Sequence, residues 1–238
     1  MSVRPLSDLN FFLGPPHACG YFTDRQARCV YADPRPPVET MPYNRLIERG
    51  FRRNGAHLYR PHCEHCTACR SLRIPVALFR DHRWQRRIRN RNADLRTTWI
   101  TPDYRDEHYA LYRSYQSGRH AGGGMDQDAP EAYRNFLVGD ASRTRFAEFR
   151  SEEHLLAVSV VDRIDHGLSA VYTFFDPKEA KRSLGSYAIL WLIDQTRACQ
   201  LPYLYLGYWI EDSPKMAYKA RFLPHEIFED GMWRRFEG

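Results

Sequence analysis

The stretch RPHCEHCTACRSLRIP, residues 60–75, places three cysteines and two histidines close together in the chain. Cys63, Cys66 and Cys69 are each separated by two residues, which is the spacing of C-x2-C metal and redox motifs. Tetrahedral zinc and iron–sulfur clusters take four such ligands, so a fourth must come from elsewhere. The spacing indicates a structural metal site, with metal-free buried thiols as the alternative. The candidates for the fourth ligand are Cys19, Cys29, His62 and His65.

Other uses of these thiols are less favoured. The sequence has no apolar run long enough for a signal peptide or a membrane span, so we expect a cytoplasmic protein, where disulfides are rare. No βαβ pattern surrounds the cysteines, which argues against a thioredoxin-type redox site. A nucleophilic cysteine would need a base that the sequence alone does not assign. The sixth cysteine, Cys199, is expected in the core because it lies on a predicted apolar helix.

Charge is distributed unevenly along the chain. Residues 1–96 carry 18 arginines and no lysine against 8 acidic residues, a net charge of +10, whereas residues 97–238 have a net charge of −4. A basic block of this kind is typical of polyanion binding. Six of these arginines lie within residues 80–91 with one acidic residue among them, and four are at helical spacing: Arg80, Arg83, Arg87 and Arg91. We expect this helix to contact nucleic-acid phosphates, with a solvated helix surface as the alternative. The arginines expected to do so are Arg83, Arg86, Arg87 and Arg91.

These residues must be positioned by a mixed set of elements. The patterns predict helices at about 43–54 and 130–138, a helix with Thr101 as N-cap and Pro102 in its first turn, and a glycine-rich loop at 118–130. Strands are predicted at 71–79, 144–150, 154–163, 167–175 and 203–207, an apolar helix at 187–200 and a further helix around 213–222. Antiparallel strands followed by helix, strand and helix resemble the core order of the GCN5-related acyltransferase fold.

The loop RSLGS, residues 182–186, precedes the apolar helix. Free main-chain N–H groups at such a position bind anions. The loop partly resembles the R-x-x-G-x-A pyrophosphate loop of acetyl-coenzyme A enzymes, but Tyr187 stands where a small residue is required. An acetyl-coenzyme A-dependent N-acetyltransferase is therefore an alternative function.

The most distinctive run is YLYLGYWIEDSPKMAYKARFLPHE. Together with YNRLIERGFRRNG, CEHCTACRSLRIPV, GLSAVYTFFDP and RSLGS, it closely resembles the bacterial aminoacyl-tRNA–protein transferases, which are relatives of eukaryotic arginyl-tRNA–protein transferase. The resemblance is collinear from Phe11 to Trp233. It implies transfer of leucine from leucyl-tRNA to the N-terminal Asp or Glu of acceptor proteins, which creates a degradation signal. An arginyl-tRNA donor, or a non-enzymatic RNA-binding module, remains an alternative.

The resemblance also implies a fold and a metal site. We expect an α+β protein with a small Cys- and Arg-rich N-terminal domain, residues 1–96, and a GCN5-related acyltransferase-like domain, residues 97–238. In the eukaryotic relatives, N-terminal cysteines that begin with a Cys-Gly-Tyr-Cys motif hold zinc or an iron–sulfur centre. Here CGYF keeps the first cysteine but has Phe22 in place of the second. The expected set for a structural zinc or iron–sulfur cluster is Cys19, Cys63, Cys66 and Cys69, and the chemistry itself requires no cofactor.

An aminoacyl ester on tRNA is already activated, so catalysis should depend on positioning and on donors to the oxyanion. Tyr208 and Glu211 are candidates for an optional general base. The acceptor carboxylate requires cationic or strong hydrogen-bond partners. Lys215 and Lys219 lie four residues apart, on one face of the helix predicted there. The other candidates for substrate binding are Arg119, His120, Arg182 and Tyr218; no membrane partner is expected.

Overall fold

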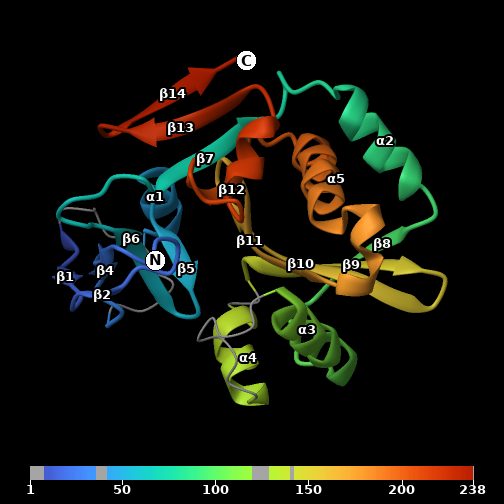
Figure 1. Ribbon diagram of the computed structural model, residues 1–238, viewed down its shortest axis with the longest axis horizontal. Helices are drawn as coiled ribbons and strands as arrows, with labels where there is room; N and C mark the ends of the chain where they lie inside the picture. Colours follow the sequence, from blue (N-terminus) through green and yellow to red (C-terminus); the bar gives the residue numbers. More distant parts are fainter. Residues whose placement is uncertain (1–7, 36–41, 120–128, 140–141, 238) are drawn as a thin grey trace.

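The apolar run HLLAVSVVDRI forms strand β10 (His154–Ile164), and nearly all of its residues are buried. A strand buried on both faces requires a covering layer on each side of its sheet. Helix α5 (Leu184–Ala198) packs on one face and α3 (Asp106–Arg119) on the other, as Figure 1 shows. The computed structural model describes residues 8–35, 42–119, 129–139 and 142–237. The expected α+β class is confirmed.

The large sheet has eight strands in the order β14-β13-β7-β12-β11-β10-β9-β8. All neighbours are antiparallel except β11 and β12, which run parallel. The bounds of these strands, besides β10, are β7 (Arg70–Pro75), β8 (Arg96–Ile100), β9 (Thr144–Ser151), β11 (Gly167–Phe175), β12 (Tyr203–Trp209), β13 (His225–Glu229) and β14 (Met232–Phe236).

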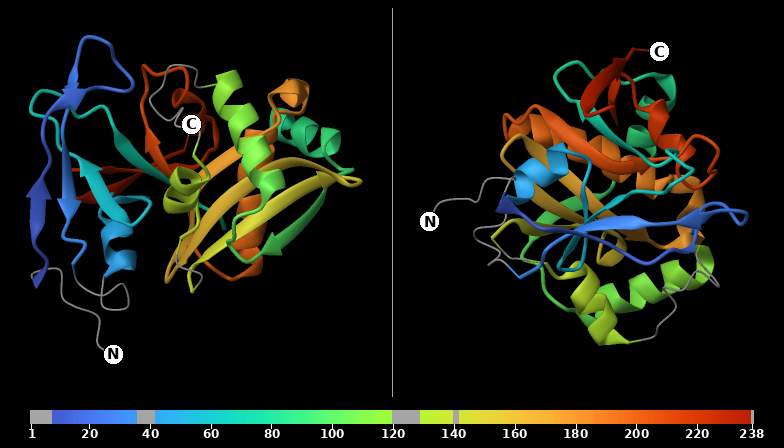
Figure 2. Two further views of the ribbon diagram at one scale, coloured as in Figure 1. Left: turned by 90° about the horizontal axis from the view of Figure 1, so that it is seen from below. Right: turned by 90° about the vertical axis from the view of Figure 1, so that its left-hand side faces the viewer.

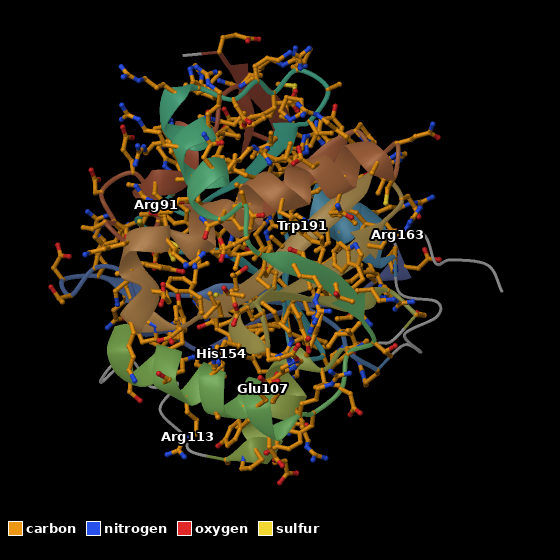
Figure 3. The ribbon with its side chains drawn as sticks, turned by 90° about the vertical axis from the view of Figure 1, so that its right-hand side faces the viewer. Arg91, Glu107, Arg113, His154, Arg163 and Trp191 are labelled. Carbon is orange, nitrogen blue, oxygen red and sulfur yellow. The ribbon has the colours of Figure 1, made fainter. Side chains whose placement is uncertain are left out.

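Different side chains fill the two faces of this sheet. Helix α5, with α2 (Arg83–Arg91) beside it, covers one face with aliphatic residues, and its Trp191 packs on Trp99 of β8 with 4.9 Å between ring centroids (Figure 3). The other face is covered by α3 and α4 (Pro130–Leu137), and its cluster is largely aromatic. No helix in the described ranges is long and apolar enough to cross a membrane.

A second, smaller sheet lies beside the large one (Figure 2). Its buried residues pack with α1 (Tyr43–Glu48) against Ile164 and Tyr205 of the large sheet, so the two sheets share one core cluster. The strand order is β1-β4-β6-β5, with bounds β1 (Phe11–Leu13), β4 (Cys29–Ala32), β5 (Arg52–Asn54) and β6 (His57–Pro61). A separate two-stranded ribbon pairs β2 (His17–Ala18) with β3 (Gln26–Ala27).

The structure confirms most predicted elements and corrects three helices. The helix predicted at 43–54 ends at Glu48, because Gly50 turns the chain with φ +82° and residues 52–54 pair as a strand. The helix expected to begin near Thr101 begins at Asp106, so neither Thr101 nor Pro102 lies in its first turn.

The third correction concerns residues 213–222, where the structure has only the short 3-10 helix η4 (Ala217–Arg221). Most of the glycine-rich loop, residues 120–128, lies outside the described residues. The division at residue 96 stays a prediction, although β7, which precedes that residue, is an interior strand of the large sheet.

Candidate functional site

Strands β11 and β12 separate part-way along their length. They pair in parallel through three residue pairs only, of which the last joins Ser169 to Tyr205. Beyond this pair β11 runs on to Phe175 and β12 to Trp209, with no further pairing between them in the described chain. We call the region beyond the last pair the strand split. Residues 167–169 of β11 are buried, but residues 170–173, beyond the split, are only half-buried.

Two buried cationic side chains meet at the strand split. Arg52 of β5 is 7% exposed and donates from Nη1 to Ser169 Oγ over 3.3 Å, while its Nε and Nη2 have no partner among the described residues. Lys219 of η4 is 9% exposed and donates from Nζ to the main-chain oxygen of Tyr208 over 2.7 Å. Gly207 lies between them with φ +78°; a Cβ there would stand 3.7 Å from Arg52 Nε and 3.8 Å from Lys219 Nζ.

The electrostatics of this pair follow from burial. Desolvation, together with the neighbouring Arg52 charge, lowers the pKa of Lys219 to about 7. Burial also lowers the pKa of Arg52. Neither side chain forms an ion pair with an acidic residue in the described part of the chain. An anion that entered here would therefore meet two charges without a counter-charge.

Tyr208, a predicted catalytic residue, is one of the tyrosines around Arg52. The hydroxyl donates to the main-chain oxygens of Gly50 (3.1 Å) and Tyr59 (3.2 Å), and burial raises the pKa of Tyr208 well above its usual value. This geometry favours a structural role, because a base would first have to give up that proton. The other candidate, Glu211, is exposed and pairs with Arg70 at 3.3 Å. The catalytic roles of both residues stay predictions.

Tyr208 and Glu211 line a cavity of about 800 Å³ together with the cysteine cluster. Burial raises the pKa of Cys69 to about 12, and the nearby Cys19 adds to this effect. The N–H of Ala68 lowers the pKa of Cys66, whose Sγ also lies 3.5 Å from Arg25 Nη1. The cysteines that line the cavity are Cys19, Cys29, Cys63, Cys66 and Cys69. In the described ranges, however, no three His, Cys, Asp or Glu side chains are arranged to hold a metal ion.

The predicted substrate-binding residues do not gather in one place. Lys215 is exposed whereas Lys219 is buried, because residues 213–216 are not helical and a four-residue spacing there does not define one face. Tyr218, between them, is 36% exposed. Arg182 is held in ion pairs with Asp94 (2.8 Å) and Glu179 (3.2 Å).

The two remaining substrate-binding candidates flank the glycine-rich loop. Arg119 is the last residue of α3, and its side chain lies outside the described set, as does all of His120. Of the six predicted substrate-binding residues, Lys219 is therefore the one that the structure places at the strand split.

The predicted nucleic-acid-binding arginines are all exposed on α2: Arg83, Arg86, Arg87 and Arg91. The inner face of the helix is formed by Gln85 and Ile88, and Arg89 pairs with Asp81 and Asp194. None of the four exposed arginines forms an ion pair with an acidic side chain of the described residues. Figure 3 views this side of the molecule, with Arg91 and Arg163 labelled on opposite sides of it.

Sequence reasoning did not single out Arg52 or Gly207. Arg52 belongs to the run RGFRRNG, where two adjacent arginines follow an apolar segment, and Gly207 interrupts the strand pattern YLYLGYW. A glycine within a strand indicates a bulge or a close approach, and the register of β12 against β7 does shift between Tyr205 and Gly207.

Sequence comparison matches the chain to two family models along most of its length. Residues 17–87 match the N terminus of the arginine-tRNA-protein transferases, and residues 107–229 match the C terminus. Proteins named aspartate/glutamate leucyltransferase match from end to end. The one from Nitrosococcus oceani is 48% identical over 95% of each chain, and the one from Pseudomonas paraeruginosa is 48% identical over 97% of this chain and 98% of that one.

Solved structures resemble a smaller part of the chain. The structure of L-PGS from Bacillus licheniformis has a TM-score of 0.45 and 13% identity, and covers 59% of this chain and 45% of that one. A conserved protein of unknown function from Bacteroides thetaiotaomicron has a TM-score of 0.43 and 16% identity, over 59% of this chain and 51% of that one.

Proposed function

The chain belongs to the arginine-tRNA-protein transferase family, and on that premise we propose that it transfers leucine from leucyl-tRNA to the N-terminal Asp or Glu of acceptor proteins. The observation that carries this proposal is the 48% identity, over nearly the whole chain, to proteins named aspartate/glutamate leucyltransferase. The new N-terminal leucine would mark the acceptor for proteolysis. Charged tRNA is a cytoplasmic substrate, so the proposed reaction takes place in the cytoplasm.

The reaction needs no covalent enzyme intermediate. The neutral α-amine of the acceptor attacks the ester carbonyl, the new C–N bond forms, and the C–O bond to the terminal ribose of the tRNA breaks. The proton lost by the amine ends on the ribose oxygen. A free α-amine has a pKa near 8, so a useful fraction is neutral at physiological pH. The enzyme must therefore hold two substrates in line and stabilise the oxyanion between them.

We place this reaction at the strand split. Antiparallel strands β9, β10 and β11, followed by α5 and a parallel β12 that diverges from β11, support the proposal of a GCN5-related acyltransferase-like arrangement for this half of the chain. The main-chain groups of β11 and β12 that have no strand partner at the split are the donors proposed for the oxyanion.

The exposed arginines of α2 support a tRNA-binding surface. A flexible cation without an acidic partner loses little when it approaches a phosphate, and each neutralised phosphate releases counterions from the RNA. The surface comprises Arg83, Arg86, Arg87 and Arg91.

The metal site also remains a proposal. Five thiols line one cavity, yet their geometry among the described residues does not form a ligand set. Elemental analysis of protein purified without added metal would test it: about one zinc, or iron with sulfide, per chain supports the site. Metal-free protein that keeps full activity and an unchanged melting temperature would rule out the proposed metal site.

One assay tests the function. Purified protein is incubated with radiolabelled leucyl-tRNA or arginyl-tRNA and with peptides that begin with Asp, Glu, Arg or Ala. We expect label from leucyl-tRNA on the Asp and Glu peptides only. Transfer of label from arginyl-tRNA, and not from leucyl-tRNA, would show that arginyl-tRNA is the donor. Acetylation of the same peptides with acetyl-coenzyme A, or tRNA binding without transfer, would contradict the proposal.

A further inference from the structure

Two adjacent arginines in β5, Arg52 and Arg53, differ in whether their guanidinium groups are paired with a carboxylate. Arg53 donates from Nε and Nη2 to the two carboxylate oxygens of Asp162, over 2.8 and 3.2 Å. Arg52 points to the other side of the strand, and its Nε and Nη2 are buried without a partner in the described part of the chain. These two nitrogens form the edge of a guanidinium that binds a carboxylate side-on. Arg52 therefore presents the same binding edge that Arg53 uses, but without the carboxylate.

The second cation faces the same space. Lys219 Nζ has three protons, and one of them is used by the main-chain oxygen of Tyr208. Arg52 Nε and Lys219 Nζ are the two atoms that a Cβ on Gly207 would meet within 4 Å. A Cβ there would be in ordinary van der Waals contact with both cationic groups, so both groups lie next to Gly207, which is itself half-buried.

We propose that Arg52 and Lys219 bind the side-chain carboxylate of the acceptor's N-terminal Asp or Glu in the space beside Gly207. This inference rests on the proposed function and assigns the residues that select its acceptor. One carboxylate oxygen accepts from Arg52 Nε and the other from Nη2, with a Lys219 proton as a third donor. The bound anion supplies the counter-charge that the described residues do not.

The location suits an acceptor that must react nearby. Arg52 Nη1 bonds Ser169 Oγ, and Ser169 belongs to the last pair of residues before β11 and β12 separate. In an N-terminal Asp or Glu the carboxylate is only a few bonds from the α-amine. A carboxylate held by Arg52 therefore keeps the amine at the strand split, where the ester must arrive.

The depth of the pair argues against a tRNA phosphate as its ligand. Arg52 and Lys219 are 7% and 9% exposed, so a phosphodiester with a ribose on each side cannot approach both. A carboxylate at a free chain end is smaller and has no ribose on either side, so it is the anion that we assign to the pair. The phosphate-binding role falls instead to exposed arginines such as those of α2.

The pair also explains how neutral acceptors would be rejected. An Asn or Gln side chain has the shape of Asp or Glu but no charge, so it would leave two buried cations uncompensated. Sites built around a specific polar partner reject analogues that lack it by large factors. We expect a preference of at least about 100-fold in kcat/KM for Asp over Asn.

The test compares the wild-type protein with Lys219→Met and Arg52→Met. Peptides that differ only in their first residue, Asp or Asn, are used at saturating leucyl-tRNA, and the affinity for leucyl-tRNA is measured separately. We expect each variant to lower the Asp-over-Asn ratio at least tenfold, mainly through the KM for the Asp peptide. The affinity for leucyl-tRNA should stay within about twofold. Lys178→Met, which removes an exposed lysine, is the matched control and should keep the ratio.

Three outcomes decide the proposal. An unchanged ratio in both folded variants overturns it, and so does loss of leucyl-tRNA binding with the ratio kept. If Arg52→Met does not fold, Arg52→Lys keeps one charge without the side-on edge and should also lower the ratio. If the wild-type protein transfers no leucine, the proposed function is wrong, but the pocket can still be tested by calorimetry with the Asp and Asn peptides. The proposed pocket should bind the Asp peptide preferentially. Equal binding of the two peptides would reject the pocket.

Discussion

Arg53 Nε lies 2.8 Å from Asp162 Oδ2, and this ion pair joins the small sheet to the centre of the large one. Tyr43 of α1 also donates to Asp162, and Thr144 of β9 does so over 2.7 Å. Asp162 is fully buried, so these donors take the place of water around its carboxylate.

Asp162→Asn should therefore destabilise the protein strongly. The change leaves the charge of Arg53 buried without compensation, and we expect the free energy of unfolding to fall by about 3–5 kcal/mol. Denaturant unfolding measures this. Asp165→Asn, at an exposed turn three residues later, is the control and should change stability by less than about 0.5 kcal/mol. Equal effects of the two variants would show that Asp162 does not connect the sheets.

Acceptor binding should weaken as the pH rises above 7. Lys219 has a pKa of about 7 in the free protein, and a bound carboxylate stabilises its charged form. Below pH 7 the lysine already carries its proton, whereas above pH 7 binding must take one up. The Kd of an Asp peptide should then rise by up to about tenfold per pH unit.

Calorimetry between pH 6 and 8.5 without tRNA checks this dependence. Arg52 faces Lys219 and keeps its charge in this range. The tyrosines around Arg52 have raised pKa values and stay neutral: Tyr43, Tyr59, Tyr205 and Tyr208. The amine of the peptide titrates equally with either protein, so the difference between wild type and Lys219→Met isolates the lysine. Parallel pH curves for the two proteins would rule out its titration.

Lys219→Met should also stabilise the free protein. Folding lowers the pKa of this lysine from 10.5 to about 7, so the unfolded chain binds more protons between these values and stability rises with pH across that window. Below pH 7 the full cost of burying the charge is present, and its removal should add on the order of several kcal/mol to the free energy of unfolding. Melting at pH 6 and pH 9 measures this gain, which should be larger at pH 6. If Lys219→Met has a lower melting temperature than the wild type at pH 6, the charge of Lys219 is not uncompensated in the folded protein.

The arginines of α2 make a prediction that depends on salt. Replacing Arg87 and Arg91 together with Ala should weaken tRNA binding and reduce the slope of log affinity against log salt by about 2. Filter binding at several salt concentrations measures both quantities. Arg163→Ala, which removes an exposed arginine on the opposite side of the view in Figure 3, should leave the slope unchanged. If the double variant binds tRNA as tightly as the wild type at low and moderate salt, α2 is not part of the tRNA-binding surface.

Local sequence patterns predicted the elements of the large sheet well. Strand β10 and helix α5 carry long apolar runs, and the structure buries nearly all of β10 and the core-facing side of α5. The exposed arginines of α2 followed from spacing in the same way. Patterns failed where a single backbone conformation decided the outcome, as at Gly50 with its φ of +82°. Cys199, expected in the core, is exposed because it follows the last turn of α5.

The candidate site depended on contacts that spacing does not show. Arg52 and Ser169 are 117 residues apart, and the sequence contains nothing that pairs them. Lys219 was selected for its spacing from Lys215, yet it reaches the strand split because η4 buries it, while Lys215 stays exposed. The resemblance of RGFRRNG and YLYLGYW to a family drew attention to the segments that contain Arg52 and Gly207, but it did not show that these segments meet.

The position of β7 limits how the two parts of this gene can recombine. This strand comes from the first 96 residues, yet it lies between β12 and β13, which come from the last 40. A gene fragment that encoded only the later residues would specify a sheet with its interior strand missing and two unpaired edges exposed. The two parts of this gene cannot be shuffled independently, and each must evolve in step with the other.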